Sequence, residues 1–157
     1  MTGPPILSFA PFVQILMVAM ILGDAKITKA FRIRAKFVVH TVGPYLDAAG
    51  HTQPKLLSSC YYKSLQLAKD HGLHSIAFPS ISSGIHSLNP ASLLIDIYVD
   101  IHHCLVGYYG YPIAEAGKVG IKTIEHFLQE SPAYDLTVVL VAFDELTHKI
   151  YLKLMSS

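Results

Sequence analysis

Three short apolar runs, each closed by turn residues and followed by a segment with helical spacing, constrain the fold most strongly. They are residues 36–42 (KFVVHTV), 74–79 (HSIAFP) and 136–143 (LTVVLVAF). Their length, β-branched content and flanking Gly or Pro residues are typical of buried strands. The continuous apolar pattern of the third run predicts a strand that is covered on both faces.

Segments with helical spacing alternate with these runs. Residues 54–72 begin at Pro54 and end at Gly72, and residues 112–129 also begin at a proline, which suits the first turn of a helix. Asp144 is a suitable N-cap for a last helix after the third strand. The alternation predicts an α/β fold with a mixed, largely parallel sheet flanked by helices.

In such sheets, ligands bind beyond the carboxyl ends of the strands. We therefore expect a ligand-binding site in the loops that follow Val42, Pro79 and Phe143. The second of these loops reads SISSG, and small hydroxyl and glycine residues leave backbone N–H groups free to bind a phosphate. The sequence thus predicts an anion-binding loop after the second strand.

Composition excludes several classes of protein. The chain has 157 residues, 52% of them apolar, and a net charge of +1, which suits one globular domain and gives no bulk attraction to nucleic acid. Cys60 and Cys104 form no CxxC pair, so neither a disulfide framework nor a structural zinc site is expected, and a reducing compartment is the default. The basic residues between 26 and 36 have no aromatic platform beside them and are expected to form a solvated loop.

The first part of the chain is unusually apolar. Residues 6–22 form a nearly continuous apolar run followed by basic residues, which approaches the pattern of a membrane span. No basic residue precedes the run, as one would in a signal peptide. We expect a buried or non-native segment and a cytoplasmic or nuclear protein, with a membrane anchor as the alternative.

Four stretches of the sequence carry a resemblance to a known family. GDAKITKAFRIRAKFVVHTVGP, CYYKSLQLAKDHGLHSIAFPSISSG, YGYPIAEAGKVGIKTI and VLVAFDE occur in this order and together resemble the macro domain, the ADP-ribose-binding module. The resemblance implies a three-layer α/β sandwich. It points to the branch that removes mono-ADP-ribose from proteins or deacetylates O-acetyl-ADP-ribose. The implied partners are ADP-ribose or a mono-ADP-ribosylated protein, with no cofactor, no nucleic acid and a monomeric state.

The resemblance also implies the ligand-binding residues. In macro domains, the Ser-Ser-Gly loop and a Tyr-Gly-Tyr-Pro stretch wrap the diphosphate and the distal ribose, and an aromatic residue after the last strand stacks on adenine. Without the resemblance, Phe143 would be interpreted as a core residue. The matching positions here are Ser82, Ser83, Gly84, Ile85, Tyr109, Gly110, Tyr111 and Phe143.

The sequence departs from the family in two places. Residues 1–22 do not resemble the family's first portion, which carries the Asn-Ala-Ala-Asn stretch credited with catalysis, so residues 23–157 are expected to be an incomplete macro domain with unknown catalytic residues. Asp24 belongs to the later GDAKIT motif and is not the adenine-reading aspartate. An insertion at about 85–107 separates the two halves of the phosphate loop and is expected to break its run of N–H groups.

The insertion has a pattern of its own. Residues 95–102 alternate between apolar and polar, which predicts a half-exposed strand. Asp96, Asp100 and His102 would share one face, but such residues are usually solvated, and no metal site is expected. One hypothesis explains both departures, namely a mispredicted start and an unspliced intron translated in frame.

Three functions remain open on the sequence. The first is an ADP-ribosyl hydrolase, the second a non-catalytic ADP-ribose-binding module, and the third an inactive fragment from a faulty gene model. His40 lies on a predicted buried strand, so it is expected to be a hydrogen-bonded core residue and not a general base.

Overall fold

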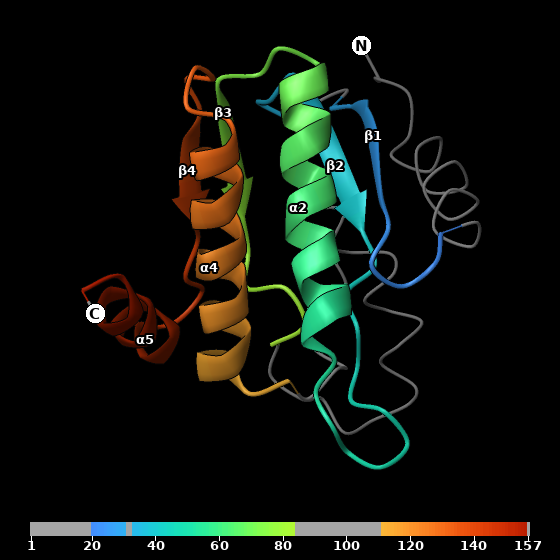
Figure 1. Ribbon diagram of the computed structural model, residues 1–157, viewed down its shortest axis with the longest axis vertical. Coiled ribbons are helices and arrows are strands. Elements are labelled where there is room, and N and C mark those ends of the chain that lie inside the picture. Colours follow the sequence, from blue (N-terminus) through green and yellow to red (C-terminus); the bar gives the residue numbers. More distant parts are fainter. Residues whose placement is uncertain (1–19, 31–32, 84–110, 157) are drawn as a thin grey trace, which may run out of the picture.

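The computed structural model describes residues 20–30, 33–83 and 111–156, which alternate between strands and helices (Figure 1). The α/β class predicted from the sequence is confirmed. In chain order the elements are β1 (Ala25–Lys29), β2 (Phe37–Thr41), α2 (Pro54–Asp70), β3 (Ser75–Phe78), α4 (Ile113–Glu130), β4 (Thr137–Leu140) and α5 (Glu145–Met155).

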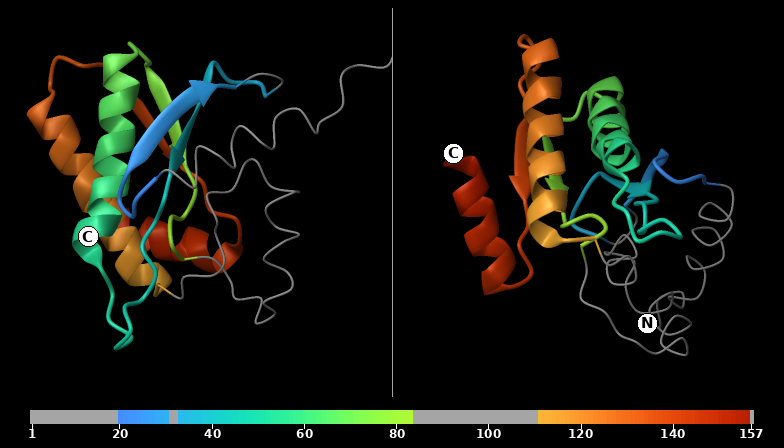
Figure 2. Two further views of the ribbon diagram at one scale, coloured as in Figure 1. Left: turned by 90° about the vertical axis from the view of Figure 1, so that its right-hand side faces the viewer. Right: turned by 60° about the horizontal axis from the view of Figure 1, so that its bottom comes forward.

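The strands form a mixed set of pairs. β1 and β2 are antiparallel, with Ile27 opposite Val39, and β3 and β4 are parallel, with Ile76 opposite Val138. Within the described residues these are two separate two-stranded sheets. Helices α2 and α4 stand side by side in front of the strands, and α5 lies beyond β4 at the edge of the molecule (Figures 1 and 2).

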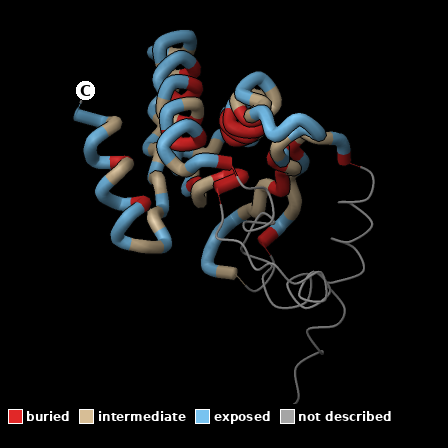
Figure 3. Tube along the Cα trace, turned by 90° about the horizontal axis from the view of Figure 1, so that it is seen from below, coloured by how far each residue is buried: buried red, intermediate tan, exposed pale blue. Residues whose placement is uncertain are grey.

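The core lies between α2, α4 and the strands behind these two helices. Seen from the end of the molecule, the buried positions gather on these inner faces while the outer faces are exposed (Figure 3). Gly120 of α4 lets the two helices pack closely, because a Cβ atom there would lie 2.8 Å from Cζ of Tyr61 on α2. The core cluster comprises Leu57, Cys60, Tyr61, Leu65, Phe78, Ile81, Tyr111, Ala116, Ile124 and Phe127.

Two expectations from the sequence are wrong. The basic segment was expected to be a loop, but it contains β1. In this strand Lys26 and Lys29 are exposed and Ala25 is buried. Pairing with β2 orders this segment despite its lysines. The third run is not covered on both faces, because Val139 and Val141 are each 48% exposed.

Two expectations about single residues are confirmed. Asp144 caps α5, since its Oδ1 accepts a hydrogen bond of 2.7 Å from the N–H of Thr147. His40 is buried, and its Nε2 lies 2.9 Å from the hydroxyl of Thr28 on β1. Burial lowers the pKa of His40, so its ring is held neutral between the strands.

The apolar segment 6–22 falls almost wholly outside the described residues, and so does the segment 95–102 that was predicted to be a strand. At its described end, Met20 is buried and Ile21 is 72% exposed. None of the helices in the described part of the chain has the length and apolarity that a membrane crossing requires.

Candidate ligand-binding site

The predicted edge of the sheet is assembled at one end of the molecule. The carboxyl ends of β2, β3 and β4 point toward the lower end in Figure 1, where α2 and α4 also begin. Strand ends and helix starts therefore meet at this edge. The loop between β3 and α4 is the part that the sequence assigns to an anion.

The loop that follows β3 is a tight turn of serine residues. Ser82 has a φ of 65°, the left-handed region that few residues other than glycine adopt. The hydroxyls of Ser80 and Ser83 are hydrogen-bonded to each other, and Ser83 Oγ donates to the carbonyl of Ser80 at 3.2 Å. Strained backbone of this kind persists where the surrounding structure holds it, and it is frequent at ligand-binding sites.

The side chain of Ser82 is turned toward the loop after β2. Its Oγ is buried and has no hydrogen-bond partner in the part of the chain that the structure describes. A Cβ atom on Gly43 would lie 2.4 Å from this oxygen and 2.8 Å from Cγ2 of Ile81. Glycine at position 43 is therefore what lets the two loops pack against each other.

Tyr111 joins the segment before α4 to the same loop. Its amide donates to the carbonyl of Ser82 at 3.3 Å, and its side chain is only 3% exposed. Burial raises the pKa of its phenol, and a hydrogen bond with Thr52 in the loop after β2 opposes that rise. The described ends of the two predicted half-loops are thus in direct contact, despite the insertion between them.

The amino end of α4 lies next to this contact. Pro112 is the N-cap residue and provides no side-chain hydrogen bond to the first turn. The dipole and the unbonded N–H groups of a helix start favour an anion. Glu115 in the first turn of α4 opposes this attraction in part.

Phe143 occupies the end of the third predicted strand but not the core. It lies beyond β4, before the cap of α5, and is 85% exposed. Phe143 is therefore not the core residue that it would be taken for without the resemblance. Stacking on adenine stays a prediction.

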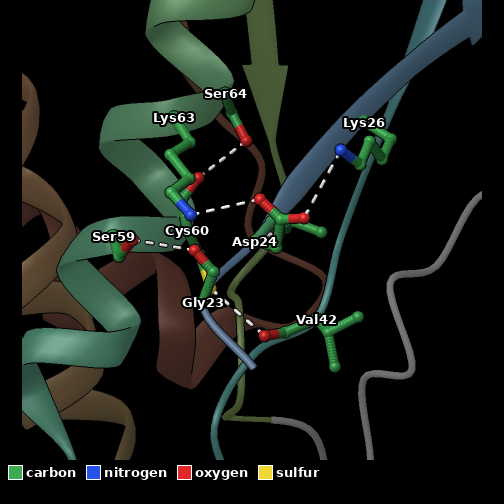
Figure 4. Close-up of polar contacts among 9 residues, drawn as sticks. Gly23, Asp24, Lys26, Val42, Ser59, Cys60, Lys63 and Ser64 are labelled. Carbon is green, nitrogen blue, oxygen red and sulfur yellow. Dashed lines mark hydrogen bonds and ion pairs between the residues drawn. The ribbon is translucent and has the colours of Figure 1, made fainter. Parts of the chain in front are cut away.

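Asp24 has a structural role at the start of β1 (Figure 4). Its carboxylate lies 3.1 Å from Lys63 Nζ on α2 and 3.6 Å from Lys26 Nζ. The hydrogen bond from Lys63 is the main reason why the pKa of Asp24 is lowered. Beside it, the carbonyl of Gly23 accepts a hydrogen bond of 2.8 Å from Ser59, so this corner ties β1 to α2.

Of the predicted ligand-binding residues, the structure brings Ser82, Ser83 and Tyr111 together. Gly84, Ile85, Tyr109 and Gly110 lie outside the described residues, as do Asp96, Asp100 and His102. Within the described residues, no group of three or more His, Cys, Asp or Glu side chains could hold a metal ion. Sequence reasoning missed the contact of Gly43 with the loop, although the Gly-Pro turn after β2 was a signal that a tight approach occurs there.

Comparison with known proteins decides the family. The macro domain model matches residues 15–93, half of the chain. The chain belongs to the macro domain family. A macro domain-containing protein of Chlorobaculum tepidum is 35% identical over 135 residues, which are 86% of this chain and 64% of that protein. An O-acetyl-ADP-ribose deacetylase of Citrobacter rodentium is 34% identical over 134 residues, or 85% of this chain and 62% of that protein.

Solved structures of macro domains share the fold. The Oceanobacillus iheyensis macro domain with ADP has a TM-score of 0.72 at 31% identity, with 98% of this chain and 70% of that chain covered. The Trypanosoma brucei macro domain in complex with ADP-ribose has a TM-score of 0.64 at 28% identity, with 85% and 46% covered. This macro domain chain spans slightly less than two thirds of the length of the curated relatives that it matches.

Proposed function

We propose that this macro domain binds ADP-ribose, with the diphosphate at the Ser80–Ser83 loop and the start of α4. The observation that carries the proposal is the hydrogen bond of 3.3 Å from the Tyr111 amide to the carbonyl of Ser82. It brings the left-handed serine turn, the buried Tyr111 ring and the start of α4 into one place. Turns of this kind and helix starts both present N–H groups to phosphate oxygens.

The similar structures support this ligand. One is described with ADP and another with ADP-ribose, and both share the fold of this chain. In this arrangement Phe143, exposed beyond the end of β4, is the aromatic surface for the adenine ring. A mono-ADP-ribosylated protein would present the same group to the same loop.

A substitution at Phe143 tests the assignment of the adenine end. Stacking of a base on an aromatic side chain contributes about 1–3 kcal/mol, so Phe143→Ala is expected to weaken ADP-ribose binding by at least about 5-fold in isothermal titration calorimetry. Leu152→Ala is the matched control, because Leu152 is also an exposed apolar residue, on α5. Equal affinities of the Phe143 variant and the wild type would refute the assignment.

Hydrolysis is the second candidate function, and the relative named O-acetyl-ADP-ribose deacetylase favours it. The reaction would depend on positioning by the loop and on water activated near the diphosphate. The test is release of ADP-ribose from a mono-ADP-ribosylated protein and of acetate from O-acetyl-ADP-ribose. Saturable binding without either product would identify a binding module.

A further inference from the structure

A chain of hydroxyl groups connects α5 to the serine loop. The hydroxyl of Tyr151 donates to Ser80 Oγ at 2.8 Å, across a separation of 71 residues. Ser80 Oγ is in turn hydrogen-bonded to Ser83 Oγ, and Ser83 Oγ lies 3.2 Å from the Ser80 carbonyl. The last helix of the chain therefore contacts the candidate ligand-binding loop through a polar group.

The position of Tyr151 is fixed by packing on α4. Its side chain is only 4% exposed, and a Cβ atom on Gly117 would lie 2.9 Å from its Cε1 and 3.0 Å from Cδ1 of Leu154. The ring thus lies directly on the backbone of α4 where glycine leaves room. Burial raises the pKa of the phenol, so the hydroxyl keeps its proton and acts as a donor.

The direction of the hydrogen bonds follows from this donor. Because Ser80 Oγ accepts from Tyr151, its own proton is available for Ser83 Oγ, and the Ser83 proton is available for the carbonyl of Ser80. Each of the three hydroxyls then donates one hydrogen bond, from Tyr151 to Ser80, from Ser80 to Ser83 and from Ser83 to the Ser80 carbonyl. The chain closes the turn around Ser82, whose φ of 65° would otherwise be unfavourable.

We propose that Tyr151 is a positioning residue for the ligand-binding loop, which it holds in its anion-binding shape through Ser80 and Ser83 without touching the ligand. The proposal rests on the proposed function for the identity of the ligand. The shape of the loop is independent of that function, because the contacts exist in the free chain. Amide hydrogen exchange of the loop therefore tests the positioning role, and ADP-ribose binding tests the proposed function.

The test compares Tyr151→Phe with the wild type. The variant keeps the ring that packs on Gly117 and removes only the hydroxyl. Loss of one hydrogen bond is expected to speed amide hydrogen exchange at Ser83 and Tyr111 by about 3- to 10-fold and to weaken ADP-ribose binding to a similar degree. The helix amides of α2 and α4 should exchange as in the wild type.

Tyr134→Phe is the matched control. The hydroxyl of Tyr134 donates to the carbonyl of Leu73, before the start of β3 and at its opposite end from the loop. This variant also loses one tyrosine hydroxyl bonded to the chain around β3. It should leave both the exchange of the loop amides and the affinity for ADP-ribose unchanged.

Ser80→Ala provides a second route to the same contact. It removes the acceptor of the Tyr151 hydroxyl, so it is expected to give the same loop signature, and it carries the test if Tyr151→Phe does not fold. Ser80→Ala also removes the hydrogen bond between Ser80 and Ser83, so the double variant should lose no more than Ser80→Ala alone. Wild-type exchange at Ser83 and Tyr111 in Tyr151→Phe, or additive effects in the double variant, would overturn the proposal.

Refutation of the proposed function gives a different experimental result from refutation of the positioning role. If the wild type does not bind ADP-ribose, the identity of the ligand is refuted, while the exchange of the loop amides still decides whether Tyr151 holds the loop. If the wild type binds and Tyr151→Phe binds equally with unchanged exchange, the positioning role is refuted and the proposed function stands.

Discussion

Substitution of Gly43 by alanine probes the contact between the loops after β2 and β3. The φ of Gly43 is not in the left-handed region, so alanine can adopt its backbone conformation. The obstacle is steric, because the new Cβ would lie 2.4 Å from Ser82 Oγ and 2.8 Å from Cγ2 of Ile81. At least one of these loops must shift to accept the methyl group.

The expected cost follows from two opposing effects. Overpacking of a tight site costs about 1–3 kcal/mol, and replacing glycine by alanine returns about 0.4–1 kcal/mol through the unfolded state. Gly43→Ala should therefore lower the free energy of unfolding by about 1–2 kcal/mol. For a domain of this size that is a fall in Tm of about 2–8 °C, measured by circular dichroism and checked by urea unfolding.

A second substitution isolates the responsible atom. Ser82→Gly removes the closest atom and suits a φ of 65°. In that background Gly43→Ala should cost less than half of what it costs in the wild type, with Ile81 responsible for the remainder. A cost that is the same in both backgrounds, or a Gly43→Ala variant as stable as the wild type, would refute the packing of these loops described above.

Two further predictions concern the core and the corner at the start of β1. Gly120→Ala should lower the free energy of unfolding in urea, because the new Cβ would lie 2.8 Å from the buried ring of Tyr61. This cost should exceed the helix propensity of about 1 kcal/mol that alanine gains over glycine. A more stable variant would contradict the contact between α2 and α4. Asp24 has a lowered native pKa because of Lys63, so its stabilisation is complete above the unfolded value of about 3.9 and is lost as the pH falls through the native value. Asp24→Asn should therefore be less stable at pH 7 and lose less stability on acidification, and parallel curves of stability against pH would show that the ion pair contributes nothing.

The sequence predicted the elements whose signals are local. Pro54 and Gly72 mark the limits of α2, and Asp144 caps α5, as the structure confirms. β1 was missed because its lysines resemble a solvated segment and its order comes from pairing with β2. The exposure of Val139 was missed because a continuous apolar run does not reveal what covers each face of a strand.

The candidate site was predicted only in part, because only some of its residues belong to a local sequence motif. Ser82 and Tyr111 could be found from a motif, and the structure brings them together. The left-handed φ of Ser82, its contact with Gly43 and the hydrogen bond from Tyr151 to Ser80 join residues that are far apart along the chain. Such contacts depend on the folded arrangement and leave no periodic signal in the sequence.

Isothermal titration of the full chain with ADP-ribose, beside AMP as a control, tests the central claim most directly. The account predicts saturable binding of one ADP-ribose per chain and much weaker binding of AMP, because AMP lacks the diphosphate that the loop around Ser82 would hold. The contradicting result is a chain that unfolds cooperatively but shows no heat of binding with millimolar ADP-ribose.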